Sequence, residues 1–145
     1  MKRRGMAIIP LIAILTIGCD DPISIDPSDL VGTWTALSYS WLDKADLVTV
    51  YDMIPDGGSF VVTFGSDGSY SATRTAPDGA VESLNGTYSI AAPQLTFSDF
   101  GNGQPEPFLA TRDTDSMTLV TGNAEFDFDD DGVPDPAQLS IFLQR

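Results

Sequence analysis

The chain has 145 residues, of which 21 are acidic and seven are basic, and it contains one cysteine and no histidine. Its formal net charge of −14 disfavours nucleic acid as a partner, because such binding relies on Lys and Arg to displace counterions from phosphates. The lack of histidine excludes Ser-His-Asp and Cys-His catalysis as well as zinc sites with histidine ligands. Carboxylate chemistry, hydroxyl chemistry and the binding of hard metal ions remain.

The N-terminus has the pattern of a secretory signal peptide. MKRRG supplies three positive charges, and the stretch MAIIPLIAILTI after it is too short to cross a membrane core, which needs about 20 helical residues. The sequence therefore predicts a signal peptide over residues 1–18. Residues 19–145 then hold 21 acidic and four basic side chains, so that their net charge is −17. This charge disfavours direct contact with an anionic membrane surface.

Residues 15–19, Leu-Thr-Ile-Gly-Cys, resemble the lipobox of bacterial lipoproteins. The resemblance implies cleavage after Gly18, lipidation of Cys19, and anchoring to a membrane of the bacterial cell envelope, on its periplasmic or surface face. Anchoring by two or more acyl chains is firm, because each buried CH₂ contributes about 0.8 kcal/mol. The alternative is an ordinary signal peptide in which Cys19 occurs by chance. We expect residues 19–29 to form the lipidated start and a short linker outside the folded domain.

Residues 30–145 have the pattern of one all-β domain. Short segments of β-branched and aromatic residues alternate with clusters of Gly, Asp, Asn and Pro, and no segment has a sustained helical period. Asn85-Gly86 indicates a turn or bulge. The pattern favours an antiparallel meander of eight to ten strands that closes into a small β-barrel, which removes edge strands; a β-sandwich is the alternative. The expected strands cover residues 31–41, 45–54, 59–64, 69–75, 81–90, 94–98, 108–112, 117–121, 125–128 and 138–144.

Three segments of this domain resemble the compact lipocalin-like domains of bacterial lipoproteins. They are DLVGTW at 29–34, which contains the Gly-x-Trp of a first lipocalin strand, FGSDGSY at 64–70 and NGTYSI at 85–90. The resemblance implies that Trp34, which follows Gly32, closes one end of the barrel. It also implies that an arginine packs over the indole, and Arg145 is our first candidate, with Arg112 behind it. The second lipocalin motif is absent; residues 113–115, Asp-Thr-Asp, are only faintly similar to it.

The resemblance further implies a small apolar or amphipathic ligand inside the barrel. The alternative is a filled interior, because eight strands enclose a space that side chains alone can fill. The candidate lining residues are the apolar side chains expected on the inner face: Leu37, Tyr39, Trp41, Tyr51, Phe60, Val62, Phe64, Tyr70 and Phe97.

An acidic segment, EFDFDDDGVPDPA at 125–137, stands out near the C-terminus. It holds six carboxylates, and no Lys or Arg occurs between Arg112 and Arg145 to neutralise them. The DxDxDG spacing matches the first half of an EF-hand-like calcium loop, but Gln138 replaces the usual Glu and the flanks are expected to be strands. We expect weak structural binding of Ca²⁺, with a Kd of about 10⁻⁴ to 10⁻³ M; a solvated loop without metal is the alternative. The candidate ligands are Asp127, Asp129, Asp131, the carbonyl of Val133, and Asp135.

Three functions are compatible with these features. The first is a lipid-anchored lipocalin-like protein that binds a small molecule. The second is a cell-envelope protein with a filled barrel that contacts another protein. The third, an enzyme with paired carboxylates, is the weakest, because most acidic residues fall in turns, where they are solvated. We therefore expect a binding protein and no catalysis.

Overall fold

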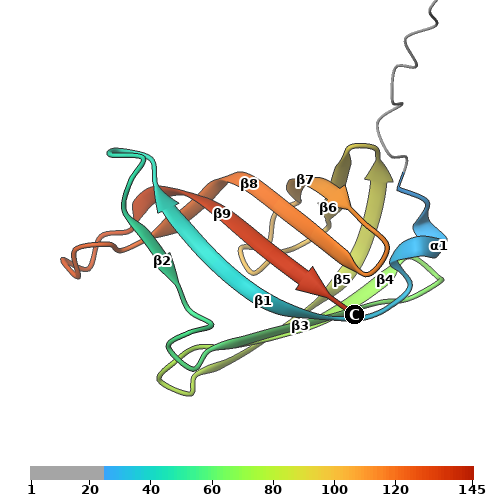
Figure 1. Cartoon of the computed structure of the whole chain (residues 1–145), viewed down its shortest axis with the longest axis horizontal. Helices are drawn as coiled ribbons and strands as arrows, with labels where there is room; N and C mark the ends of the chain where they lie inside the picture. Colours follow the sequence, from blue (N-terminus) through green and yellow to red (C-terminus); the bar gives the residue numbers. More distant parts are fainter. Residues whose placement is uncertain (1–24) are drawn as a thin grey trace, which may run out of the picture.

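In the computed structural model, which describes residues 25–145, nine strands form one antiparallel sheet that closes on itself (Figure 1). The strands pair in the order β2-β1-β3-β4-β5-β6-β7-β8-β9, and β9 also pairs with β1. Eight strands therefore form a closed barrel, and β2 lies beside the second half of β1. This confirms the all-β meander and rules out the β-sandwich. The strands are β1 (Gly32–Asp43), β2 (Val50–Asp52), β3 (Ser59–Phe64), β4 (Ser69–Thr75), β5 (Val81–Ala91), β6 (Gln94–Phe97), β7 (Glu106–Arg112), β8 (Ser116–Phe126) and β9 (Asp135–Gln144).

The two ends of the barrel differ. A short helix, α1 (Pro27–Leu30), lies at the end where β1 begins and β9 ends, which we call the closed end (Figure 1). Asp26 caps α1 by accepting a hydrogen bond from the Ser28 N–H at 2.8 Å. The β1–β2 and β8–β9 loops lie at the opposite end, which we call the mouth. Among residues 25–145, no helix is long and apolar enough to cross a membrane.

The start of the domain differs from the expected linker. Ile25 is 5% exposed and belongs to the hydrophobic core, and Leu30 in α1 is fully buried. The last part of the segment expected as linker therefore packs onto the closed end. The predicted signal peptide and Cys19 lie outside the described residues.

Alternation of side chains explains most of the strands. In β3, Phe60, Val62 and Phe64 are buried while their neighbours face outward, as period-two alternation requires. Leu37 in β1 is an exception, because the register against β9 shifts between Ala36 and Ser38. This bulge turns Leu37 to the outer face, where it is 52% exposed, so its prediction as a lining residue was wrong.

Some strand limits also differ from those predicted. The segment expected as a strand at 45–54 is mostly loop, and only Val50–Asp52 forms β2. The segments 117–121 and 125–128 belong largely to one strand, β8, which has an irregularity between Thr121 and Ala124. Asn85-Gly86 is not a turn, since β5 continues through it and Gly86 pairs with Tyr70 of β4.

Aromatic rings fill the barrel interior between the two ends. Phe97 is the centre of this packing, with ring centroids of Phe64, Tyr70, Phe100 and Phe108 at 4.8 to 5.9 Å. Phe97 itself is 0% exposed. The middle of the barrel is therefore a packed core, as expected for an eight-stranded barrel with large inward side chains.

Asp52 ties β2 to the barrel. Its carboxylate accepts hydrogen bonds from Ser38 Oγ at 2.6 Å, the Tyr39 N–H at 3.1 Å and the Ile54 N–H at 3.0 Å. Burial opposes ionisation, but the three hydrogen bonds together outweigh it and hold the pKa of Asp52 below its usual value.

We expect Asp52→Asn to lower the free energy of unfolding by about 1 kcal/mol at neutral pH, because an amide cannot accept all three bonds and solvent screening limits the loss. A lowered folded-state pKa gives stabilisation that is present above the unfolded-state pKa, about 3.9, and is lost as the pH falls through the folded-state value. Urea denaturation across this range should show the difference between variant and wild type shrinking at acidic pH. A difference that does not change with pH would contradict this reading.

Candidate functional site

Charged side chains occupy inward positions of the strands near the mouth, and Arg74 and Glu106 are two of them. Arg74 follows the buried Tyr70 and Ala72 at alternate positions of β4, so its side chain starts from the inner face. Glu106 precedes the buried Phe108 and Ala110 at alternate positions of β7, and it is only 8% exposed. Both side chains form a polar layer above the aromatic core.

Arg74 is neutralised within this layer. It forms an ion pair with Glu82 of β5, and its Nη1 donates a hydrogen bond to the Tyr39 hydroxyl at 3.1 Å. The guanidinium carbon also lies 5.8 Å from the centroid of the Tyr39 ring. Burial raises the pKa of Tyr39 despite the nearby cation, so the phenol is neutral at physiological pH. Arg74 is therefore engaged on two sides by groups of the barrel itself.

Glu106 has a different environment. Thr121 of β8 donates a hydrogen bond from Oγ1 to Oε1 of Glu106 at 2.5 Å. Among residues 25–145, this is the only hydrogen bond to the Glu106 carboxylate, and none of the ion pairs there includes Glu106. Burial removes most of the hydrogen bonds that water gives to a carboxylate, and here only one protein donor takes their place.

These side chains border a cavity of about 200 Å³ that opens at the mouth. Its apolar lining residues are Trp41, Phe100, Phe108, Ala124 and Leu139. Its polar and charged lining residues are Arg74, Asn102, Glu106, Thr121, Asn123 and Glu125. The arrangement combines an aromatic surface with a few fixed polar groups, as in small-molecule binding sites.

A second cavity, of about 390 Å³, adjoins this region. It shares Trp41, Arg74 and Glu125 with the first cavity, and Tyr51 and Phe126 also line it. The rings of Trp41, Tyr51 and Phe126 stack on one another, with centroids 4.8 to 6.0 Å apart. The mouth thus combines the stacked rings of Trp41, Tyr51 and Phe126 with the polar residues that line the first cavity.

The predicted lining residues divide into two groups. Trp41 and Tyr51 line the cavities of the mouth. The others, apart from Leu37, lie in the packed core and border neither of these two cavities: Tyr39, Phe60, Val62, Phe64, Tyr70 and Phe97. Within residues 25–145, the expected ligand cavity along the whole barrel is therefore not present, and the two cavities lie at the mouth.

Sequence reasoning missed Arg74, Glu106 and Thr121. The signal was present, because each of these residues stands at an inward position of a strand whose other inward residues are apolar. A charged residue on the apolar face of a strand must be paired or must face a cavity. The loop residue Phe100 had no such signal, because its place depends on how residues 98–105 fold over the barrel.

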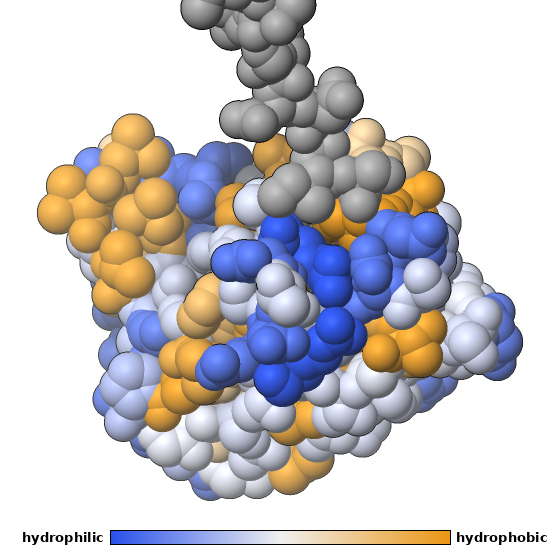
Figure 2. Space-filling view, turned by 45° about the vertical axis from the view of Figure 1, so that its right-hand side comes forward, coloured by the Kyte–Doolittle hydropathy of each residue, from blue (hydrophilic) through white to orange (hydrophobic). Residues whose placement is uncertain are grey.

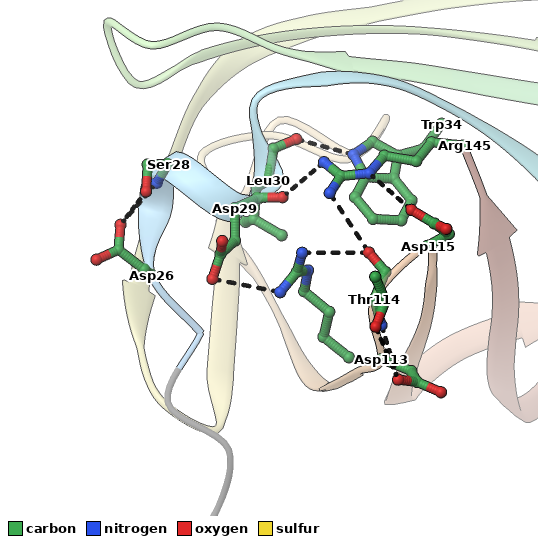
Figure 3. A network of polar contacts seen from close by, with 10 residues as sticks. Asp26, Ser28, Asp29, Leu30, Trp34, Asp113, Thr114, Asp115 and Arg145 are labelled. Carbon is green, nitrogen blue, oxygen red and sulfur yellow. Dashed lines mark hydrogen bonds and ion pairs between the residues drawn. The ribbon is translucent and has the colours of Figure 1, made fainter.

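The closed end is held by a cluster around Trp34 (Figure 3). The indole is fully buried, its Nε1–H donates to the Leu30 carbonyl at 2.8 Å, and the Arg145 guanidinium lies 4.8 Å from its centroid. Gly32, which precedes this tryptophan by two residues, has a φ of +126°, a conformation that favours glycine. This is the pairing of Trp34 and Arg145 that the family resemblance implied.

Arg145 and Arg112 link three segments at this end. Arg145 Nη1 donates to the Asp29 carbonyl at 3.0 Å, and both arginines donate to the Thr114 carbonyl, at 3.3 and 3.4 Å (Figure 3). Arg112 also pairs with the Asp29 carboxylate at 3.3 Å. These contacts show a structural role, with the arginines fixing α1 and the β7–β8 turn.

On the side of the barrel that Figure 2 brings forward, strongly hydrophilic residues gather at the centre of the face between apolar patches.

The acidic β8–β9 loop brings three carboxylates together. Asp127, Asp129 and Asp135 each place an oxygen within 4.8 Å of the other two. Asp127 also accepts hydrogen bonds from the backbone N–H groups of Asp131, at 3.2 Å, and Gly132, at 2.8 Å. The loop therefore curls around Asp127, and these three residues can hold a metal ion.

A fourth predicted ligand, Asp131, lies outside this group, and Asp135 belongs to a strand. The Asp131 carboxylate is not in the group of three and accepts a hydrogen bond from the Val133 N–H at 2.7 Å. Asp135, expected in the loop, is the first residue of β9. Two carboxylates therefore come from the loop and the third from the strand that follows it.

Comparison with known proteins gives a likeness at the level of structure. No protein-family model and no curated protein matches the chain. A solved structure of a lipocalin-like protein from Bacteroides uniformis ATCC 8492 is similar, with a TM-score of 0.47 and 19% sequence identity, over 81% of this chain and 99% of that chain. The closed barrel described above rests on the strand pairing of this chain alone.

Proposed function

We propose that the protein is a non-catalytic lipoprotein that holds a small amphipathic molecule at the mouth of its barrel. The observation that carries this proposal is the cavity of about 200 Å³, whose lining combines the aromatic side chains of Trp41, Phe100 and Phe108 with Glu106 and Thr121. Apolar surface gives affinity to such a site, and the few polar groups select the orientation of the ligand. Membrane anchoring is the part of the proposal that rests on the sequence, through the lipobox-like segment ending at Cys19.

Mass spectrometry of the full chain, extracted in detergent from bacterial membranes, tests both parts. Under denaturing conditions the mass should correspond to residues 19–145 with acyl chains on Cys19. Under native conditions an additional small molecule should be released on activation. An unlipidated chain would refute the anchoring. If no molecule is released and neither phenethylamine, 2-phenylethanol nor 3-phenylpropionate binds, the ligand-binding function is refuted.

The alternative is a cell-envelope interaction protein that uses the rim of the barrel. The β1–β2 loop favours this reading, because Leu47 and Val48 are 67% and 80% exposed and Val50 of β2 is 58% exposed. Apolar side chains grouped in this way indicate contact with another surface. Crosslinking from the loop to a single envelope protein, without a released small molecule, would favour the alternative.

We also propose that the acidic loop binds Ca²⁺ in a structural role. The grouping of Asp127, Asp129 and Asp135 supports this, because calcium takes six to eight oxygen ligands and tolerates flexible geometry. Backbone carbonyls and water would complete the coordination. A cation there would offset the repulsion between carboxylates that no ion pair among the described residues neutralises.

We expect several millimolar CaCl₂ to raise the thermal midpoint of unfolding by a few degrees, as a ligand of the folded state does at concentrations above its Kd. Asp127→Asn should abolish the increase. Asp78→Asn is the matched control, because Asp78 is an acidic residue in the exposed β4–β5 turn, and it should keep the increase. Calorimetric titration without heat, together with an unchanged midpoint, would refute the calcium site.

A further inference from the structure

We infer that the ligand of the mouth carries a cationic amine, which pairs with Glu106, next to an aromatic or aliphatic group that packs on Trp41, Phe100 and Phe108. This inference rests on the binding function proposed above and adds the chemical class of the ligand. It depends on the charge balance of the cavity, on the burial of Glu106 and on the aromatic wall.

The charges that line the cavity do not balance. The lining contains one cation, Arg74, and two carboxylates, Glu106 and Glu125. Arg74 is already paired with Glu82, which leaves no net positive charge for an anionic ligand. Neither Glu106 nor Glu125 has an ion-pair partner among residues 25–145. A cationic ligand would neutralise this excess, whereas an anionic ligand would increase it.

Glu106 is the carboxylate best placed to bind the amine. It is 8% exposed, and Thr121 supplies its one hydrogen bond, to Oε1. A carboxylate has room for about four hydrogen bonds, so most of its acceptor capacity is unused on the protein side. A primary ammonium group offers three donors and would form short charge-assisted hydrogen bonds with it. Within residues 25–145, Glu106 is therefore a mostly buried carboxyl group that borders a cavity and has no cationic partner.

The aromatic residues of the lining suit the remainder of such a ligand. Trp41, Phe100 and Phe108 present aromatic surface to the cavity, which can bind an apolar ring and can also stabilise a cation over a ring face. A volume of about 200 Å³ is below that of pockets for drug-sized ligands, which begin at about 300 Å³. The ligand that fits this first cavity is a small arylalkylamine or alkylamine.

The test compares three probes that share a phenyl ring and differ in charge. Phenethylamine is cationic, 2-phenylethanol is neutral, and 3-phenylpropionate is anionic at neutral pH. Calorimetric titration of the full chain in detergent should give the highest affinity for the amine, at least about tenfold above the alcohol, and the lowest for the carboxylate. This comparison uses the wild-type protein and does not depend on the folding of a variant.

Glu106→Gln keeps the shape of the side chain and removes its charge. It should weaken phenethylamine binding about tenfold or more and leave 2-phenylethanol binding within about twofold. Asp78→Asn removes the same charge from an exposed turn outside both cavities, and it should change neither affinity. This control separates the contact with Glu106 from a general effect of net charge.

The outcomes distinguish the inference from the function on which it rests. If the amine and the alcohol bind equally, and Glu106→Gln affects neither, the mouth binds ligands but does not select cations, and the inference is refuted. If the wild-type protein binds the amine more tightly than the alcohol, and Glu106→Gln loses this difference, the inference is supported. If none of the three probes binds at millimolar concentration, the inference is refuted; the binding function is refuted as well only if native mass spectrometry also releases no small molecule.

Discussion

Phe97→Ala is expected to lower the free energy of unfolding by about 3–5 kcal/mol, the range for large-to-small changes of a fully buried phenylalanine. Phe97 is 0% exposed, and four aromatic rings surround it within 5.9 Å. Its removal would leave a void that these rings can close only in part, so lost contacts add to the lost burial. Urea denaturation followed by tryptophan fluorescence measures the loss.

Phe142→Ala is the matched control for this prediction. Phe142 is also a phenylalanine within a strand, but it lies on the outer face of β9 and is 39% exposed. We expect a loss of about 1 kcal/mol or less, as for most surface substitutions. Equal losses for the two variants would show that the interior of the barrel is not the packed core described above.

Trp34→Ala is expected to cost a similar amount, about 3–5 kcal/mol, for a different reason. The indole closes one end of the barrel, donates to the Leu30 carbonyl and supports the Arg145 guanidinium. The change therefore removes buried apolar area and also leaves α1 and the C-terminal arginine without their shared support. Thermal and urea denaturation should both show the loss.

A double-mutant cycle separates the cation–π contact from the burial of Trp34. Arg145→Met keeps much of the apolar stem and removes the charge, and Trp34→Phe keeps a ring of smaller area. The coupling free energy between these two changes should be about 0.5–2 kcal/mol in favour of the native pair. A coupling energy of zero would mean that the two side chains lie together without stabilising each other.

Local patterns were sufficient where strands are short and joined by tight turns. The strands predicted at 59–64 and 69–75 match β3 and β4 in full, because Gly65–Gly68 forms the turn and alternation fixes which side chains face inward. The same rule failed at Leu37, because a bulge adds one residue and shifts the alternation. Nothing in the neighbouring residues reveals that shift, which depends on pairing with β9.

Gly86 shows a second limit of local reasoning. Asn-Gly is a common turn signal, but here the glycine faces Tyr70 across the β4–β5 pair. A Cβ atom at Gly86 would lie 3.2 Å from the Tyr70 ring and closer still to Ser98 Oγ. The glycine is therefore explained by close packing within a continuous strand, and such packing involves partners distant in sequence.

The functional site was harder to predict than the fold. The predicted lining set was chosen for apolar character, and most of it became core because aromatic residues fill a small barrel. The residues that border the cavity instead combine aromatic side chains with charged ones on inward positions, such as Arg74 and Glu106. Their partners lie on neighbouring strands: Arg74 pairs with Glu82, its register partner on β5, and Glu106 accepts a hydrogen bond from Thr121 of β8, so both pairings depend on strand register.

The position of the bound probe tests the central claim most directly. The chain has two tryptophans, Trp41 at the mouth and Trp34 at the closed end, so an NMR spectrum of ¹⁵N-labelled protein contains two indole N–H signals. On titration with phenethylamine, the Trp41 signal should shift progressively while the Trp34 signal stays in place. An unmoved Trp41 signal at saturating probe, or a shift of Trp34 in its place, would contradict a binding site at the mouth of the barrel.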